Sequence, residues 1–191
     1  MESIITFDQE LFLFLNGLGS NRFDQFWMLM THRGSNVLVY VSIILLLSLK
    51  IKRKQIISLV IFGLILILVT DQLTNLCKVQ VGRLRPCFDF QLKDLVRLVK
   101  SSCGGKFSFF SGHASNSFAL AFFFGRVVKR HFKIVNIILI FIAGLISYSR
   151  IYIGVHYPLD IICGMIVGSI IGILFYRMWE KLIILLNIKN K

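Results

Sequence analysis

Residues 149–160 read Ser-Arg-Ile-Tyr-Ile-Gly-Val-His-Tyr-Pro-Leu-Asp and bring an arginine, a histidine and an aspartate together in an otherwise mostly apolar chain. Pro158 lacks an N–H group and favours the first turn of a helix, so a new helix is expected to begin there. Asp160 then lies in that first turn, where a carboxylate is favoured and can reach back to His156. Arg150 closes the preceding apolar run. The stretch therefore predicts a histidine held by a carboxylate beside a permanent cation, an arrangement suited to chemistry on a phosphate group.

The composition is that of a membrane protein. Of the 191 residues, 56% are hydrophobic and only 16% are charged, and the mean hydropathy is +0.77. Soluble domains carry about a quarter charged residues. No cleavable signal peptide is expected, because Glu2, Asp8 and Glu10 stand where a basic segment should be. The length suits one domain, and we expect residues 1–191 to form a single membrane-embedded unit.

The predicted fold class is an all-α, polytopic membrane helix bundle with about five spanning helices. Residues 4–18 are apolar but carry three polar interruptions and are short for a span, so we expect an amphipathic helix in the membrane interface. A short first span, giving six in all, is the alternative. Gly164, Gly168 and Gly172 predict a small-residue face for close helix packing. The expected spans are 23–49 with a bend near 32–34, 56–77, 113–128, 134–148, and 158–176 or beyond.

The formal net charge of +13 does not indicate nucleic-acid binding, because the basic residues fall in short clusters between apolar runs. The loops 50–54 and 126–133 and the tail from Arg177 carry four Lys/Arg each, and the positive-inside rule places all three in the cytoplasm. Even numbers of spans separate them, so the assignment is self-consistent. Residues 78–112 and 149–158 are then expected to meet at the outer face. The excess of seven Lys/Arg in 78–112 is unusual for an outer loop and points to an anionic ligand.

Candidate site residues converge at that outer face. Lys78, Arg85 and Arg150 supply three cations at neutral pH, and the arginine fork matches phosphoryl oxygens. Ser111, Gly112 and His113 open a helix, where free N–H groups favour an anion and glycine allows close approach of the backbone. His156, paired with Asp160, is the better nucleophile, which leaves His113 as the general acid.

These residues resemble the three signature motifs of the type 2 phosphatidic acid phosphatase superfamily. The matching positions are Lys78-x6-Arg85-Pro86, then Ser111-Gly112-His113, then Ser149-Arg150-x5-His156-x3-Asp160, all within residues 78–160. Phe110 departs from the family pattern, which usually has proline before Ser-Gly-His, but the departure removes no catalytic group.

The resemblance implies a lipid phosphate or diphosphate phosphatase with a phosphohistidine intermediate on His156. Asp160 would orient His156, and His113 would act as acid and then as base for water. Lys78, Arg85, Ser111, Gly112 and Arg150 would bind the phosphoryl oxygens, with no metal or other cofactor required. The short chain is similar to bacterial undecaprenyl-diphosphate phosphatases and their lipid-phosphatase relatives.

The expected location is the bacterial cytoplasmic membrane, with the site on the periplasmic or extracellular side. The expected partner is a membrane lipid phosphate, which would enter sideways from the bilayer. Undecaprenyl diphosphate, phosphatidylglycerol phosphate, phosphatidic acid and lipid A phosphates all fit. No nucleic acid and no obligate protein partner are predicted.

Other interpretations of the same residues stay open. A lipid-phosphate binding or transport protein would use the same cations but gives no role to the His156–Asp160 pair. A Ser-His-Asp hydrolase on Ser111 lacks a Gly-x-Ser-x-Gly elbow. A His/His/Asp metal site would be opposed by the nearby positive charge. His32 and His131 are assigned to packing or hydrogen bonding rather than to the site.

The polar face of the expected 56–77 helix and the four cysteines carry two further predictions. Asp71, Asn75 and Lys78 share one helical face, so the first two residues either orient Lys78 or pack between helices. Cys87 and Cys103 lie in the outer loop and are predicted to form a disulfide, whereas Cys77 and Cys163 should stay reduced.

Overall fold

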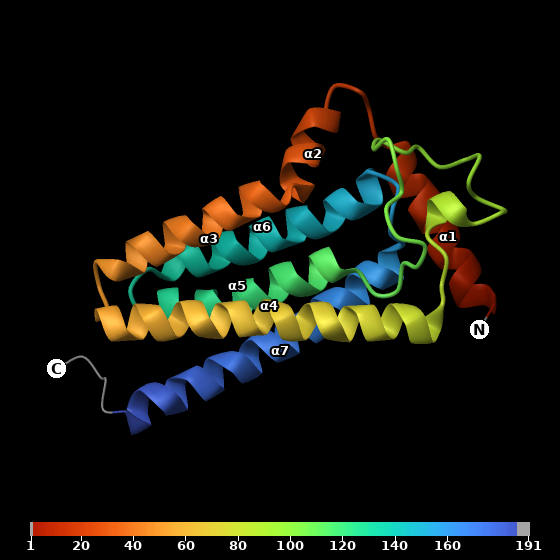
Figure 1. Ribbon diagram of the computed structural model, residues 1–191. Helices are drawn as coiled ribbons and strands as arrows, with labels where there is room; N and C mark the ends of the chain where they lie inside the picture. The colour runs from red at the N-terminus through yellow and green to blue at the C-terminus, as the bar shows by residue number, and fades with distance from the viewer. Residues whose placement is uncertain (1, 187–191) are drawn as a thin grey trace.

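A computed structural model describes residues 2–186 and shows an all-helical bundle (Figure 1). This agrees with the fold class expected from the sequence. Four helices and one helix pair run side by side, and the N-terminal helix lies across one end of them. Within the described residues the helices are α1 (Glu2–Gly17), α2 (Asp24–Thr31), α3 (Arg33–Ser48), α4 (Arg53–Val81), a short 3-10 turn (Pro86–Phe88), α5 (Gly112–Val128), α6 (Lys133–Tyr152) and α7 (Pro158–Leu185).

Each expected span corresponds to a helix or a helix pair. Helices α4, α6 and α7 are each long and apolar enough to cross a membrane. Helices α2 and α3 meet at 60° and count as a fourth crossing if the pair is one broken span, which matches the bend expected near His32. Helix α5, with 17 residues, is not among these helices, so three or four of the five expected spans meet the requirements for crossing a membrane within the described residues. Helix α1, at 16 residues, is not among the helices that meet the requirements for a span, so the six-span alternative gains no support.

Three helix ends lie three or four residues beyond their expected limits. Helix α4 runs from Arg53 to Val81 rather than over 56–77, and α6 continues to Tyr152 rather than ending at Tyr148. Lys78 and Arg150 therefore lie in the last turns of helices, not in connecting loops. Both are consequently held by helical backbone, which fixes where their side chains begin.

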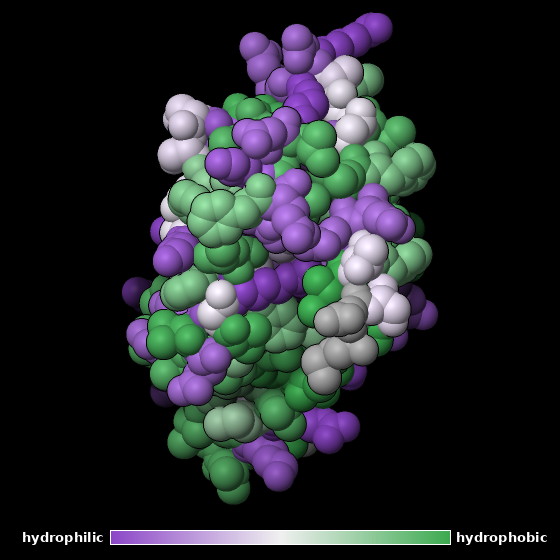
Figure 2. Space-filling view, turned by 90° about the vertical axis from the view of Figure 1, so that its right-hand side faces the viewer, coloured by the Kyte–Doolittle hydropathy of each residue, from purple (hydrophilic) through white to green (hydrophobic). Residues whose placement is uncertain are grey.

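The basic turns and the motif-bearing segments lie at opposite ends of the bundle (Figure 1). The α3–α4 turn, the α5–α6 turn and the end of α7 occupy one end. Helix α1 and the long 82–111 connection occupy the other, which Figure 2 shows face-on with hydrophilic and hydrophobic side chains intermixed. Of the basic residues expected in the cytoplasmic tail, Lys189 and Lys191 lie outside the described residues.

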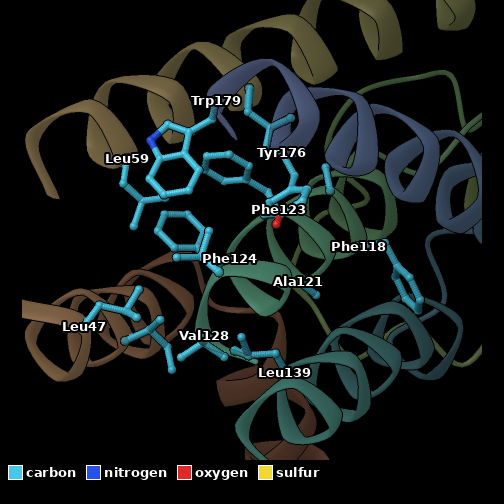
Figure 3. Packing of buried hydrophobic residues seen from close by; sticks show 14 of the residues in the cluster. Leu47, Leu59, Phe118, Ala121, Phe123, Phe124, Val128, Leu139, Tyr176 and Trp179 are labelled. Atoms are coloured by element: carbon cyan, nitrogen blue, oxygen red, sulfur yellow. The ribbon is translucent and has the colours of Figure 1, made fainter. Parts of the chain in front are cut away.

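Helix α5 lies at the centre of the bundle, and eleven of its residues are buried. Phe118, Phe123, Phe124 and Val128 of this helix point in different directions into the core (Figure 3). They meet side chains from α3, α4, α6 and α7, among them Leu47, Leu59, Leu139 and Trp179. Because α5 packs on all sides, it holds its own first turn, which carries Gly112 and His113, in a fixed position relative to α4, α6 and α7.

The glycine face of α7 packs directly on the backbone of α5, as the sequence predicts. A Cβ atom placed at Gly168 would lie 2.1 Å from the Ser115 carbonyl oxygen, and one at Gly172 would lie 2.3 Å from the Ala119 carbonyl oxygen. Only glycine allows this approach. The contact brings the start of α7, with Asp160, next to the start of α5.

We expect Gly168→Ala to destabilise the protein by about 1–3 kcal/mol, because the added methyl group overlaps the α5 backbone. Thermal unfolding in detergent measures the effect. The matched control is Gly144→Ala in α6, where an added Cβ meets nothing within 4 Å, so helix propensity should raise stability slightly. Equal unfolding midpoints for the two variants would contradict this packing.

Candidate active site

A cavity of about 560 Å³ opens at the end of the bundle that carries the sequence motifs. It is formed where the last turns of α4 and α6, the first turn of α5 and the two connecting segments meet. The cavity brings together six of the eight predicted site residues, namely Lys78, Arg85, Gly112, His113, Arg150 and His156. Asp160 and Ser111 are fully buried and are not among its lining residues.

The α6–α7 turn delivers His156 to the cavity. Gly154 has φ +83°, and its close contact with the Arg97 carbonyl leaves no room for a Cβ, so this tight reversal requires glycine. The turn is followed directly by Val155, His156 and Tyr157, and α7 begins at Pro158, as expected. The predicted helix start therefore fixes the spacing between the histidine and the aspartate.

His156 is paired with Asp160. The distance from His156 Nδ1 to Asp160 Oδ2 is 3.3 Å, and the Tyr157 backbone N–H donates to the same oxygen at 3.0 Å. His156 is 1% exposed and Asp160 is 0% exposed. Since Nδ1 is engaged by the carboxylate, Nε2 is the ring nitrogen available to a ligand in the cavity.

The electrostatic surroundings keep the His156 ring neutral. Burial lowers the pKa of His156 well below its usual value of 6.5, and the positive charges of Arg150, Arg85 and Lys78 lower it further. A neutral imidazole keeps a lone pair on the nitrogen that faces the cavity, as a nucleophile requires.

The arginines are held by uncharged groups. Arg85 donates through Nη1 to the Cys103 carbonyl oxygen at 2.7 Å and through Nε to the Phe107 carbonyl oxygen at 3.2 Å. Burial lowers the pKa of Arg85 below its usual range. Arg150 donates to the hydroxyl of Thr31, and its buried Nε has no partner among the described residues. A buried donor without an acceptor is costly, and a phosphoryl oxygen would supply the missing acceptor.

None of Lys78, Arg85 and Arg150 forms a salt bridge with an acidic side chain within residues 2–186. Arg33, the first residue of α3, adds another cation to the cavity wall. The wall therefore carries a surplus of positive charge, which favours an anionic ligand.

Ser111, Gly112 and His113 open helix α5, as the motif predicts. Gly112 and His113 line the cavity, whereas Ser111 does not. Ser111 is the N-cap, and its hydroxyl accepts from the Ala114 N–H at 3.5 Å. Its backbone N–H donates to the Asp160 carbonyl oxygen at 3.0 Å, which joins the starts of α5 and α7. This burial and capping role also counts against Ser111 as a hydrolase nucleophile. A Cβ at Gly112 would lie 3.2 Å from Thr74 Cγ2, so packing against α4 is a second reason for glycine there.

The polar face of α4 contributes to the cavity wall. Asp71 and Asn75 line it with Lys78, and Asp71 Oδ1 accepts from Asn116 Nδ2 at 2.7 Å. Asn116 also bonds the hydroxyl of Thr70. Asp71 therefore has a definite hydrogen-bond partner on α5, one turn beyond His113.

Two residues that sequence reasoning did not assign to the site contact Asp160. Arg83 Nη1 donates to Asp160 Oδ1 at 3.2 Å, and Ser108, whose backbone N–H donates to the Arg83 carbonyl oxygen at 2.8 Å, lies beside His156 and Asp160. Arg83 was visible only as one of several basic residues in the outer loop. His32 and His131, assigned to no site, are both exposed and do not line the cavity.

The other part of the cavity is apolar and extends along the bundle. Its walls come from three helices, α3, α4 and α5. The apolar lining residues are Val37, Val41, Ile44, Val60, Leu64, Ile67, Leu120 and Phe124. A single cavity therefore joins a cationic end to an apolar channel, as an amphiphile with an anionic headgroup would require.

The structure places Cys87 and Cys103 in a disulfide with their Cα atoms 6.3 Å apart, and it leaves Cys77 and Cys163 as free thiols. The disulfide joins the segment after Arg85 to the residue whose carbonyl holds Arg85. Within residues 2–186 no group of three or more His, Cys, Asp or Glu side chains could hold a metal ion.

The PAP2 superfamily profile matches residues 57–184. The chain is 34% identical over 180 residues to a lipid A 4'-phosphatase of Porphyromonas gingivalis. This alignment covers 94% of this chain and 75% of that protein. Among solved structures, it is similar to LpxE of Aquifex aeolicus, with a TM-score of 0.67, 27% identity, and coverage of 88% and 93% of the two chains. The transmembrane phosphatidylglycerolphosphate phosphatase of Bacillus subtilis shares the fold, with a TM-score of 0.74, 23% identity, and coverage of 95% and 88%.

We expect the double variant Cys87→Ser/Cys103→Ser to bind inorganic phosphate more weakly, because the carbonyl that holds Arg85 loses its covalent constraint. The loss should be about 10-fold, at the lower end of the cost of losing a group that orients a ligand contact. Phosphate affinity in detergent measures it, with the free-thiol variant Cys163→Ser as control. Unchanged affinity in the double variant would show that the disulfide does not support Arg85.

Proposed function

The chain belongs to the PAP2 superfamily, and on that premise we propose that it is an integral-membrane lipid phosphatase that removes a phosphate group from a lipid A-type glycolipid. One observation carries the proposal above all. A neutral histidine backed by a buried carboxylate faces a cavity whose cations Lys78, Arg85 and Arg150 form no salt bridge with an acidic side chain among the described residues. We treat residues 1–191 as one phosphatase domain.

The first chemical step is attack by His156 Nε2 on phosphorus. An N–P bond forms, and the bond between phosphorus and the lipid oxygen breaks. His113 donates a proton to the leaving oxygen. Positive charge develops on the His156 ring, and the Asp160 carboxylate behind Nδ1 stabilises it. The three cations and the first turn of α5 hold the phosphoryl oxygens as their charge shifts.

In the second step His113 takes a proton from water, and the resulting hydroxide attacks the phosphorus of phosphohistidine. The N–P bond breaks, inorganic phosphate is released, and His156 returns to its neutral form. The step needs no protein group beyond those that line the cavity or support His156.

Two observations support a lipid substrate. The apolar walls from α3, α4 and α5 continue from the cationic end of the cavity along the membrane helices. The lipid A 4'-phosphatase relative matches almost the whole chain. An acyl chain would lie in the apolar channel, with the phosphate at headgroup level. The basic turns at the opposite end support a cytoplasmic-membrane protein whose site faces the outer side.

The deciding experiment is phosphate release by detergent-purified protein from a panel of lipid phosphates, with a chelator present. The panel contains lipid A 4'-phosphate, phosphatidylglycerol phosphate, phosphatidic acid and undecaprenyl diphosphate. We expect turnover of lipid A 4'-phosphate in chelator and a loss of about 1,000-fold or more in His156→Ala. Intact turnover in the variant would remove His156 as nucleophile, turnover lost in chelator would indicate a metal, and binding without turnover would favour a transport protein.

His113→Ala should damage monoester hydrolysis more than diphosphate hydrolysis. A monoester expels an alkoxide that needs a proton, whereas a diphosphate expels a lipid phosphate, which leaves readily. We expect about a 100-fold loss in kcat on the monoester and a clearly smaller loss on the diphosphate. Equal losses on both substrates would contradict the acid role of His113.

A further inference from the structure

Arg83 bridges two buried carboxylates that belong to opposite ends of the chain. Its Nη2 lies 2.6 Å from Asp8 Oδ2, and its Nη1 lies 3.2 Å from Asp160 Oδ1. The side chains of Asp8 and Asp160 are 2% and 0% exposed. Arg83 does not line the cavity. Its guanidinium therefore contacts Asp160 from outside the cavity and does not reach a phosphate bound in it.

The bridge completes the hydrogen bonding of Asp160. Oδ2 faces His156 Nδ1 and the Tyr157 N–H, while Oδ1 receives Arg83. With both oxygens engaged, the carboxylate plane is fixed. A buried carboxylate beside a neutral imidazole is also costly unless a nearby cation compensates its charge. Arg83 is the cation within salt-bridge distance of Asp160 among the described residues.

Helix α1 fixes Arg83 in turn. Asp8 binds Arg83 through Oδ2 and accepts from the Leu159 N–H through Oδ1 at 2.9 Å, so one carboxylate connects α1, the outer loop and the start of α7. The guanidinium also stacks 3.8 Å from the centre of the Tyr157 ring. The Tyr157 hydroxyl donates to Asp89 at 3.1 Å, which holds that ring in place.

We propose that Arg83 and Asp8 are positioning residues for the His156–Asp160 pair, so that helix α1 is part of the catalytic apparatus. The inference rests on the proposed function, in which His156 attacks phosphorus. As the N–P bond forms, the ring becomes cationic and depends on an Asp160 carboxylate that is charged and correctly oriented. Loss of the bridge therefore weakens the chemical step while the phosphate-binding cations remain in place.

Arg83→Met tests this directly. We expect kcat to fall by about 10-fold to 100-fold, the usual cost of losing a group that orients a catalytic side chain. The KM for the lipid phosphate and the inhibition constant of inorganic phosphate should stay within about twofold, because Lys78, Arg85 and Arg150 are untouched. Arg83→Lys keeps the positive charge but cannot bind both carboxylates at once as the guanidinium does. We expect its kcat to lie between those of wild type and Arg83→Met.

Arg97→Met is the matched control. Arg97 lies in the same outer connection, pairs with Asp24 at 2.8 Å and stacks 5.5 Å from the centre of the Tyr152 ring. It resembles Arg83 in chemistry but contacts no predicted site residue. We expect its kcat to match wild type. An equal loss of kcat in both variants would overturn the inference, because it would reflect general loosening of the loop.

A second measurement does not depend on turnover. Nitrogen NMR of the His156 ring, assigned by its loss in His156→Gln, should show the proton on Nδ1 in the wild type. Asp8→Asn, which leaves Arg83 itself in place, and Arg83→Lys should increase the share of the Nε2-protonated form. These milder variants carry the test if Arg83→Met does not fold.

The outcomes separate the two proposals. Wild-type protein that releases no phosphate would remove the proposed function, and the ring tautomer would then decide the positioning role by itself. Active wild type with full kcat in Arg83→Met, or an unchanged tautomer in Asp8→Asn and Arg83→Lys, would overturn the positioning role alone.

Discussion

The constraint on which the rest of the structure depends is the gathering of cations at one end of a membrane bundle, where none of them forms a salt bridge with an acidic side chain within residues 2–186. Lys78, Arg85 and Arg150 come from three separate segments, yet they line one cavity. Partly buried like charges repel one another strongly. Helical backbone fixes where the Lys78 and Arg150 side chains begin, and carbonyl and hydroxyl groups hold the two arginines. Such an arrangement favours an anionic ligand.

Elements outside the sequence motifs do much of that holding. Arg85 donates hydrogen bonds to two loop carbonyl groups near the Cys87–Cys103 disulfide. Arg150 donates to Thr31, which lies at the bend between α2 and α3, so that bend places a partner beside an arginine of the cavity. The glycine face of α7 sets the distance between the starts of α5 and α7. The motifs supply the chemistry, and the surrounding helices supply the geometry.

Hydropathy and local spacing were enough to predict much of this arrangement. Apolar runs located the helices, basic turns indicated which ends face the same way, and a four-residue separation on a new helix predicted the His156–Asp160 pair. The Asp8–Arg83–Asp160 bridge could not be found in this way. Asp8 is 75 residues from Arg83 and looks like a polar interruption in an amphipathic helix. No periodic pattern links residues so far apart, and only the tertiary position of α1 reveals their contact. Ser111 likewise proved to be a buried cap beside the cavity.

The most direct test of the central claim is to trap the phosphoryl group on the protein. Rapid mixing with lipid A labelled in its 4'-phosphate, an alkaline quench and peptide mapping would locate the label. The proposed mechanism predicts phosphohistidine at residue 156, formed faster than phosphate is released or at the same rate. Turnover with no label on His156, or with label on another residue, would contradict it.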